Sequence, residues 1–289
     1  MKLPFLSLAS LLLAGLSGAV AQSPSASTRD DSAAEKLGWH LANKEYTFRN
    51  LTLFETIDIT RSLGLKYFEL NPTLKVSKEN PATIDPNLSP EARTAIKKKF
   101  ADAGVQVVGF GVVKLTKDEA ADRKTFQLAK DLGIQILVSE PEAGSFDILD
   151  KLCDEFQISI AIHNHPSPSP YWKPDLVLAA IQGHNKRIGA CADVGHWTRS
   201  GLNAVECLHQ LAGHIVSLHF KDVDDNKKDV PWGQGKTDVH GMLTELHRQK
   251  FQGLFSMEYE GSTGDTLIAD LKKSIAVFDS EAKKLAAAP

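Results

Sequence analysis

The feature that most constrains this chain is a repeated alternation of helix-like and strand-like segments. The segments "SPEARTAIKKKFADAG" and "DEAADRKTFQLAKDLG" carry apolar residues at helical spacing and end at glycine, and each precedes a β-rich run, "VQVVGFGVV" or "IQILVSE". The same rhythm runs from the strand-like "LGWHLANKEY" to "LFSMEYEG" and gives about eight strand–helix units. This order predicts an α/β fold, and the number of units predicts a single-domain, closed (β/α)8 TIM barrel.

An open, doubly wound sheet is the structural alternative, because it is built from the same units. Runs such as "IQILV" are apolar on both faces, as the strands of either parallel sheet require. Polar residues follow the carboxyl ends of most of the strands. A barrel gathers such ends around one mouth, whereas an open sheet spreads them along an edge, so we favour the barrel.

The amino-terminal residues predict export. Lys2 precedes an apolar run, and the small residues Ala19 and Ala21 precede Gln22, so we interpret residues 1–21 as a cleaved signal peptide. The polar residues 22–36 are expected to form a flexible tether, and residues 37–289 the barrel. We therefore expect a secreted or periplasmic protein, with an uncleaved signal anchor as the only membrane contact to consider.

Charge and cysteine content exclude some classes of protein. The formal net charge is -3, and the lysines and arginines are scattered, which disfavours a nucleic-acid partner. The three cysteines, Cys153, Cys191 and Cys207, lie at apolar positions of the helix and strand patterns. We expect them to be small buried side chains, and a chain of this size needs no disulfide framework.

Titratable side chains close five successive predicted strands. They are Glu140, His163 with His165, Asp193 with His196, His219 with Lys221, and Glu258 with Glu260. Because side chains alternate along a strand, His163 and His165 should share a face, with Asn164 turned away. Carboxylates and imidazoles are costly to bury unless they are paired or bound to a cation. Mixed nitrogen and oxygen ligands suit Zn, Mn, Co or Fe better than Ca, so we predict one divalent metal ion, identity open.

Two tryptophans and two titratable residues after the predicted strands are candidates for sugar binding. Trp172 and Trp197 follow the fifth and sixth predicted strands and can form stacking walls, although simple packing explains them equally well. We assign His196, Trp197, Trp172 and Glu260 as candidate substrate-binding residues.

The ordered segments "IHNHP", "CADVGHW", "SLHFKD" and "SMEYEG" resemble the xylose-isomerase-like barrel superfamily of sugar phosphate isomerases and epimerases over residues 37–283. The resemblance implies one divalent ion held by the fifth to eighth strands, with Asp193, His219 and Glu258 at family ligand positions. The fifth-strand metal ligand in the ketose epimerases of this superfamily is usually a glutamate, and this chain has His163 at that place, which makes His163 the fourth candidate ligand.

The segment "YWKPD" and the export signal are most similar to secreted members that act on 3-keto-glycosides. This resemblance implies that the metal polarises a ketone at C3, a base takes the C2 proton, and the C1 substituent leaves by β-elimination. Glu140 or His165 is the candidate base, with Glu140 alternatively an extra ligand, and Lys221 is the candidate acid or electrophile.

Two other functions stay open at this point. One is a ketose isomerase or epimerase that works through an enediolate with the same metal. The other is a non-catalytic sugar- or metal-binding module of the cell envelope. An exported protein is expected to meet neutral oxidised glycosides rather than sugar phosphates.

Overall fold

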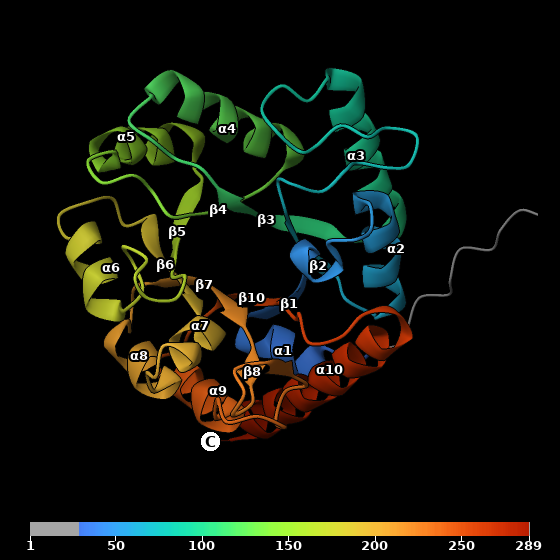
Figure 1. Cartoon of the computed structure of the whole chain (residues 1–289), viewed down its shortest axis with the longest axis vertical. Helices are drawn as coiled ribbons and strands as arrows, with labels where there is room; N and C mark the ends of the chain where they lie inside the picture. The colour runs from blue at the N-terminus through green and yellow to red at the C-terminus, as the bar shows by residue number, and fades with distance from the viewer. Residues whose placement is uncertain (1–28, 289) are drawn as a thin grey trace, which may run out of the picture.

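The computed structural model describes residues 29–288 and confirms the predicted closed barrel (Figure 1). Eight parallel strands pair in the order β1-β10-β7-β6-β5-β4-β3-β2. Their bounds are β1 Trp39–Lys44, β2 Tyr67–Leu70, β3 Gln106–Val113, β4 Ile136–Ser139, β5 Ser159–His163, β6 Ile188–Asp193, β7 Ile215–Phe220 and β10 Gly253–Met257.

An outer ring of helices surrounds the strands (Figure 1). It consists of α2 Leu53–Ser62, α3 Pro90–Ala103, α4 Glu119–Leu132, α5 Phe146–Phe156, α6 Pro174–Ile181, α8 Ala204–Gln210, α9 Val239–Arg248 and α10 Gly264–Ala287. Short elements decorate the carboxyl ends of the strands: the 3-10 helix η1 Glu45–Phe48, the helix α7 Val194–Arg199, and the hairpin of β8 Asp222–Val223 and β9 Asp229–Val230.

Local sequence explains where the helices begin and end. Thr52 accepts a hydrogen bond from the Glu55 backbone at the start of α2, and the Glu55 carboxylate accepts one from the Thr52 backbone. Ser89 caps α3 in front of a proline, and Gly104 ends the helix at φ 64°, a left-handed conformation that glycine adopts most easily. These signals make the helix boundaries predictable from the sequence.

The apolar core lies mainly between the strands and the helices. Trp39, Phe255 and Phe278 pack together there, with ring centroids 5.2 to 5.9 Å apart. A smaller set of apolar side chains, Ala42, Val108 and Leu254, forms a separate cluster. Because side chains alternate along each strand, residues two positions beyond Ala42 and Leu254 continue towards the carboxyl-end mouth, and these are polar.

The amino-terminal boundary differs from the prediction. Helix α1 Ser32–Leu37 occupies part of the expected tether and packs against α10, and Arg29 forms an ion pair of 2.6 Å with Asp279. The fold therefore includes residues that the prediction assigns to the tether, and residues 32–36 are helical. The predicted signal peptide and the remainder of the tether lie outside the described residues.

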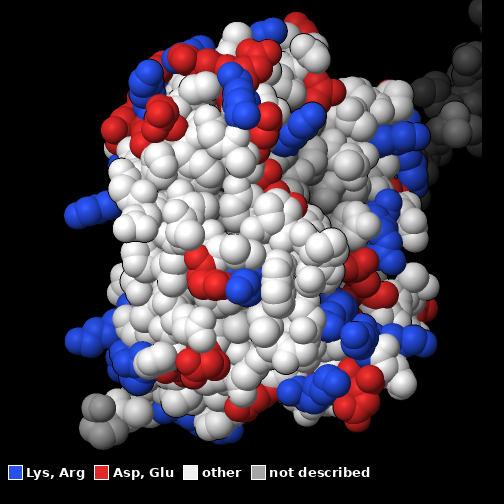
Figure 2. All heavy atoms as spheres, turned by 60° about the vertical axis from the view of Figure 1, so that its left-hand side comes forward, with Lys and Arg blue, Asp and Glu red and all other residues white. Residues whose placement is uncertain are grey.

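Three further expectations can be compared with the described part of the chain. Cys153, Cys191 and Cys207 are buried and free, as expected. No helix among residues 29–288 is long and apolar enough to cross a membrane. Figure 2 shows Lys and Arg interspersed with Asp and Glu on the face it presents, which agrees with the scattered charges of the sequence.

Candidate active site

A cavity of about 380 Å³ opens at the carboxyl ends of the barrel strands. The predicted site residues His163, His165, His196, His219, Lys221, Glu258 and Glu260 line it. Six lining residues were not predicted from the sequence: Lys44, Tyr46, Asn71, Pro72, Thr73 and Val112. The mouth of the barrel is therefore where the titratable side chains converge.

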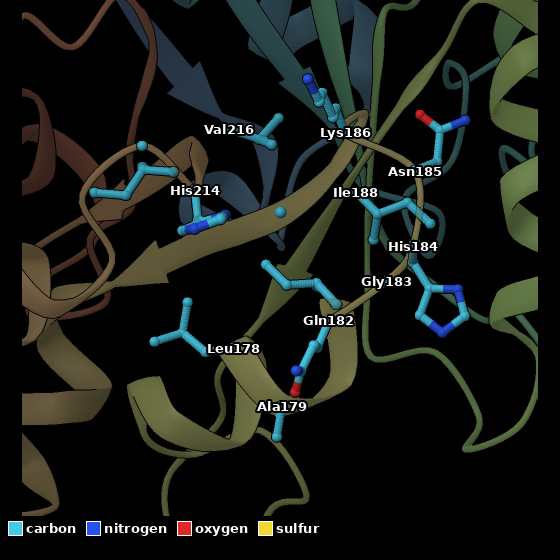
Figure 3. Close-up of a pocket in the computed structure, with 14 residues that line it drawn as sticks. Leu178, Ala179, Gln182, Gly183, His184, Asn185, Lys186, Ile188, His214 and Val216 are labelled. Atoms are coloured by element: carbon cyan, nitrogen blue, oxygen red, sulfur yellow. The ribbon is translucent and has the colours of Figure 1, made fainter.

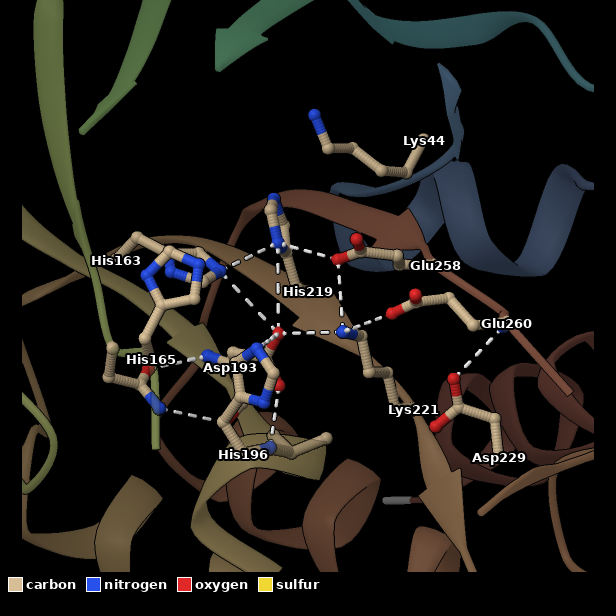
Figure 4. Close-up of polar contacts among 12 residues, drawn as sticks. Lys44, His163, His165, Asp193, His196, His219, Lys221, Asp229, Glu258 and Glu260 are labelled. Carbon is tan, nitrogen blue, oxygen red and sulfur yellow. Dashed lines mark hydrogen bonds and ion pairs between the residues drawn. The ribbon is translucent and has the colours of Figure 1, made fainter. Parts of the chain in front are cut away.

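Four of the predicted residues form what we call the ligand group: His163 on β5, Asp193 on β6, His219 on β7 and Glu258 directly after β10. One potential ligand atom from each lies within 4.8 Å of all the others, and all four residues are buried (Figure 4). Two of the separations are His219 Nδ1 to Glu258 Oε2 at 2.9 Å and His163 Nε2 to Asp193 Oδ2 at 3.5 Å. The predicted convergence of these four residues is confirmed.

Asp193 is oriented by the start of a helix. Its Oδ1 accepts a hydrogen bond of 2.7 Å from the His196 backbone and so caps α7. Its Oδ2 belongs to the ligand group and is buried without a hydrogen-bond partner. The D-x-x-H pattern is thus a helix start, and the expectation that His196 closes a strand is wrong, because β6 ends at Asp193.

His219 is oriented by a carboxylate that the sequence analysis missed. Its Nε2 donates to Glu69 Oε1 at 2.8 Å, which leaves Nδ1 turned to the ligand group. Glu69 is fully buried and also contacts Lys44 Nζ at 3.0 Å and Ser256. A Cβ atom at Gly109 would lie 2.8 Å from the Glu69 side chain, so this glycine makes room for it.

Lys221 places a cation between the two carboxylates of the ligand group. Its Nζ lies 3.1 Å from Asp193 Oδ2 and 3.2 Å from Glu258 Oε2 (Figure 4). Burial opposes the charge, but these carboxylates raise the pKa of Lys221 above its usual range. Lys221 is therefore suited to donate a hydrogen bond and not to remove a proton.

Glu140 and His165 form a pair at the rim of the cavity. His165 Nδ1 donates to Glu140 Oε1 at 2.9 Å, and Ser169 also donates to this oxygen at 2.7 Å. Burial opposes ionisation, yet the hydrogen bonds from His165 and Ser169 lower the pKa of Glu140 to about 2. Glu140 does not line the cavity, whereas His165 does. The arrangement thus distinguishes their roles: Glu140 orients His165, and His165 faces the cavity.

The ligand group fits a divalent cation. It offers two imidazoles and two carboxylates, a donor set that Zn, Mn, Co and Fe accept. Burial lowers the pKa of His163 to about 4, which keeps this imidazole in the neutral form that binds metals. Asp193 Oδ2 has Lys221 Nζ 3.1 Å away but accepts no hydrogen bond, so its lone pairs are available to a metal ion. The group can therefore hold the single divalent ion expected from the sequence.

The predicted tryptophans do not line the cavity. Trp197 is 1% exposed and belongs to the apolar core, so the expectation that it stacks on a substrate is wrong. Trp172 is half-buried outside the cavity, with Lys173 Nζ 5.7 Å from its ring centroid. Of the four predicted substrate-binding residues, only His196 and Glu260 lie at the cavity.

Asn164 and Asp222 do not line the cavity, but their side chains hold the backbone around it through hydrogen bonds. Asn164 Nδ2 donates to the Asp193 carbonyl at 2.9 Å, and Asn164 Oδ1 accepts from the Asp193 amide at 2.7 Å, so Asn164 is turned away from His163 as expected. Asp222 accepts backbone hydrogen bonds from Gly233, Gly235 and Thr237 at 2.8 to 3.1 Å. Asp222 therefore holds the loop that follows β9 and is not a metal ligand.

A larger cavity of about 800 Å³ lies elsewhere (Figure 3). It is lined by the end of α6, the loop before β6 and the beginning of β7, which places it at the amino ends of these strands. Barrel enzymes carry their active sites at the carboxyl ends of the strands. None of the predicted site residues lines this larger cavity, so the smaller one is the candidate active site.

Comparisons with known proteins agree with this placement. Residues 57–281 match the family described as xylose isomerase-like TIM barrel. An uncharacterized protein from Parabacteroides distasonis ATCC 8503 is 31% identical, with a TM-score of 0.70 over 84% of this chain and 99% of that chain. No curated protein matches the chain.

Two more distant structures share the fold. A xylose isomerase domain protein from Alicyclobacillus acidocaldarius is 14% identical, with a TM-score of 0.67 over 85% of this chain and 99% of that chain. D-psicose 3-epimerase from Clostridium cellulolyticum H10 is 12% identical, with a TM-score of 0.62 over 85% and 96%. The family match, the 31% identical structure and the closed barrel lead to one conclusion: the chain belongs to the xylose isomerase-like TIM barrel family.

Proposed function

We propose that the protein is an exported, metal-dependent sugar enzyme that removes a proton next to a carbonyl group, and that it cleaves a 3-keto-glycoside by β-elimination. The observation that carries the proposal is His165, which Glu140 orients and which faces the same cavity as His163, His219 and Glu258 of the ligand group. The Glu140–His165 pair supplies one oriented base, and the ligand group supplies a site for one cation. Family membership supports a sugar-acting enzyme, and the lyase reaction is our more specific inference.

The ligand group and Lys221 would act on the carbonyl oxygen of the substrate. A divalent ion held by the ligand group would supply Lewis-acid polarisation of a carbonyl, which acidifies the neighbouring C–H bond. Lys221 lies within 3.2 Å of two carboxylate oxygens of that group, so its protonated amine can donate to an oxygen that becomes negative there. Both features favour enolate formation over simple binding of the ketone.

His165 is the base in this proposal. Because its Nδ1 donates to Glu140, Nε2 carries the lone pair that can accept a proton. The C2 proton moves to Nε2, the C–H electron pair becomes the C1=C2 double bond, and the C1–O bond breaks with its electrons on the leaving oxygen. The protonated His165 can return a proton to that oxygen, so the aglycone leaves as a neutral alcohol.

The fifth strand favours elimination over epimerisation. The epimerases that this chain resembles use two carboxylates on opposite faces of the sugar, one of them on this strand. Here the position is His163, whose Nε2 lies 3.1 Å from His219 Nδ1 within the ligand group. One oriented base is enough for β-elimination, whereas epimerisation needs a proton returned from the other face. Isomerisation through an enediolate is the competing activity.

The charges at the cavity favour a neutral sugar. Its two lysines are both paired with carboxylates, Lys44 with Glu69 and Lys221 with Asp193 and Glu258. Among the described residues that line the cavity, no lysine or arginine is left over to bind a phosphate group. The predicted export signal supports the same choice, since sugar phosphates are intracellular compounds.

A 3-keto-glucoside with a chromogenic aglycone tests the proposal. The purified chain loaded with one equivalent of Mn²⁺, Zn²⁺ or Co²⁺ should release the aglycone, and chelation should abolish the release. In D₂O, deuterium should enter C2 of recovered substrate if proton removal is reversible. Stereochemical exchange without aglycone release would replace the lyase by the isomerase or epimerase. Tight binding of the sugar without any conversion would make the protein a binding module.

A further inference from the structure

A second group of possible metal ligands lies beside the first. His163, His165 and His196 each offer a ring nitrogen, and the three nitrogens lie within 4.8 Å of one another. Their ring centroids are 4.4 to 5.7 Å apart, and all three rings line the cavity. We call these residues the imidazole triad. They come from the end of β5, the loop after it and helix α7, so the fold brings three chain segments together here.

His163 has one nitrogen to spare. Its Nε2 belongs to the ligand group, 3.5 Å from Asp193 Oδ2, whereas its Nδ1 is buried without a hydrogen-bond partner. The residue is 2% exposed, so water does not compensate for the missing bond at the surface. A neutral imidazole has a single lone pair, so Nδ1 can bind a second ion when Nε2 carries the proton. Asp193, His219 and Glu258 then hold the first ion.

His165 is already oriented as a metal-binding histidine. Histidines that bind metals commonly donate their other ring N–H to a carboxylate, which fixes the tautomer and raises the basicity of the free nitrogen. The Glu140–His165 hydrogen bond of 2.9 Å has this form and leaves Nε2 free. The side chain of His165 is 46% exposed, so an ion can reach it from solvent.

The contacts that His196 makes within the protein are weak and would compete little with a bound ion. Arg199 lies 3.4 Å from His196 Nδ1, at the long end of the hydrogen-bond range, and its guanidinium is also held by Asp229. His196 Nε2 lies 3.6 Å from Asp193 Oδ2, which is beyond hydrogen-bonding distance. A nitrogen of His196 can therefore turn to an ion without breaking a strong bond.

We propose that the imidazole triad is a second, inhibitory cation site for ions that prefer nitrogen ligands, such as Zn²⁺. An ion there occupies the lone pair of His165 that the proposed reaction needs for the C2 proton. The inhibition therefore rests on the proposed function, whereas the binding of the second ion does not. Mg²⁺ prefers oxygen ligands and should not occupy this site.

Metal stoichiometry tests the site without reference to turnover. The full chain, stripped of metal and titrated with Zn²⁺ in a calorimeter, should bind two ions, and elemental analysis after desalting should agree. His196→Asn should reduce the second affinity by at least about tenfold and leave the first ion bound. His165→Gln should do the same if His196→Asn fails to fold by circular dichroism. His247→Asn is the matched control, since His247 on α9 belongs to none of the groups of possible metal ligands among the described residues, and it should retain both ions.

Turnover then tests the inhibition. Enzyme loaded with one ion should lose activity as Zn²⁺ fills the second site, and an equal concentration of Mg²⁺ should have no effect. A wild-type stoichiometry of one ion, or two tightly bound ions in both His196→Asn and His165→Gln, would overturn the proposed site. Two ions per chain at saturation, with no turnover on any 3-keto-glycoside even when only the first ion is loaded, would support the site and reject the proposed reaction. Two ions with undiminished turnover would refute the inhibition.

Discussion

His219 Nε2 lies 2.8 Å from Glu69 Oε1, so a carboxylate on the second strand sets the orientation of an imidazole on the seventh. Lys44 and Ser256 hold the same carboxylate from β1 and β10. Burial opposes the ionisation of Glu69, but His219 and Lys44 lower its pKa to about 2, so it is a carboxylate at every pH of interest. The outer contact of this candidate metal ligand thus comes from the far side of the barrel.

Glu69→Gln should weaken metal binding by about 10- to 100-fold, because the amide cannot hold His219 as a carboxylate does. Calorimetric titration with Mn²⁺ or Zn²⁺ measures the effect. Glu91→Gln, at an exposed position of α3, is the control and should bind metal as the wild type does. Equal affinity of the wild type and Glu69→Gln would show that this contact does not support the site.

Removal of the metal should lower thermal stability. Without a metal ion, only Lys221 and the neighbouring imidazoles offset the negative charges of Asp193 and Glu258. An ion that binds only the folded state raises Tm by mass action. Wild-type Tm should therefore fall on chelation, whereas Glu258→Gln, which has already lost a ligand, should respond less. An identical fall in Tm in both proteins would show that the stabilising ion does not bind at the ligand group.

Glu140→Gln should lower kcat more than it raises KM, since Glu140 orients the base and does not line the cavity. A positioned base contributes roughly 10²- to 10⁴-fold, and we expect a loss within this range. The rate of C2 deuterium exchange should fall in parallel. Ser169→Ala removes only a hydrogen bond to Glu140 and should have a smaller effect. A change in KM alone would instead indicate a binding role.

Gly195→Ala should disturb the site through Lys221. A Cβ atom at residue 195 would lie 2.8 Å from both Cβ and Cδ of Lys221, so the lysine or helix α7 must move. We expect a loss of stability of about 1–3 kcal/mol, as for other overpacked positions, together with lower kcat. Thr198→Ala on the same helix adds no atom and serves as the control. Urea denaturation and steady-state kinetics measure the two effects.

Glu45 should make stability depend on pH. Burial raises its pKa from 4.5 to about 8, despite the hydrogen bond from the Asn71 backbone and the nearby Lys44. Between these values the folded protein keeps a proton that the unfolded chain has lost, so the free energy of unfolding contributed by Glu45 falls as pH rises. The slope is at most about 1.4 kcal/mol per pH unit.

Glu45→Gln removes this dependence. Its stability relative to the wild type should therefore rise between about pH 5 and about pH 8, because the amide has no charge to bury. Urea denaturation of both proteins across this range measures the difference. A difference that does not change with pH would show that Glu45 titrates normally in the folded protein.

The barrel could be predicted from the sequence because its strands and helices repeat with clear periodicity. The ligand group could be predicted because its members close strands, and strand ends meet at one mouth. Glu69 and Lys44 also lie on predicted strands, inside "YFEL" and "LANKEY". A charged residue within a predicted buried strand indicates a buried polar contact, but the sequence does not reveal its partner on another strand.

Short elements account for the errors. Helix α1 has six residues and the hairpin strands two each, too few for a period to show. The sequence predicts a stacking role for Trp197 because it follows the sixth predicted strand. The helix that begins at Asp193 turns His196 and Trp197 in different directions, so that His196 lines the cavity and Trp197 is buried.

Asp222 shows how a phenotype at this mouth could mislead. Its carboxylate fastens the segment after β9, and Asp229 on that strand in turn accepts a hydrogen bond of 2.9 Å from the Glu260 backbone. Replacing Asp222 would remove the hydrogen bonds that hold this segment and would shift Glu260. The loss of activity would then look like that of a variant that lacks a catalytic side chain. A mutational screen would therefore group Asp222 with the catalytic residues, although its role is to hold the loop at the mouth of the barrel.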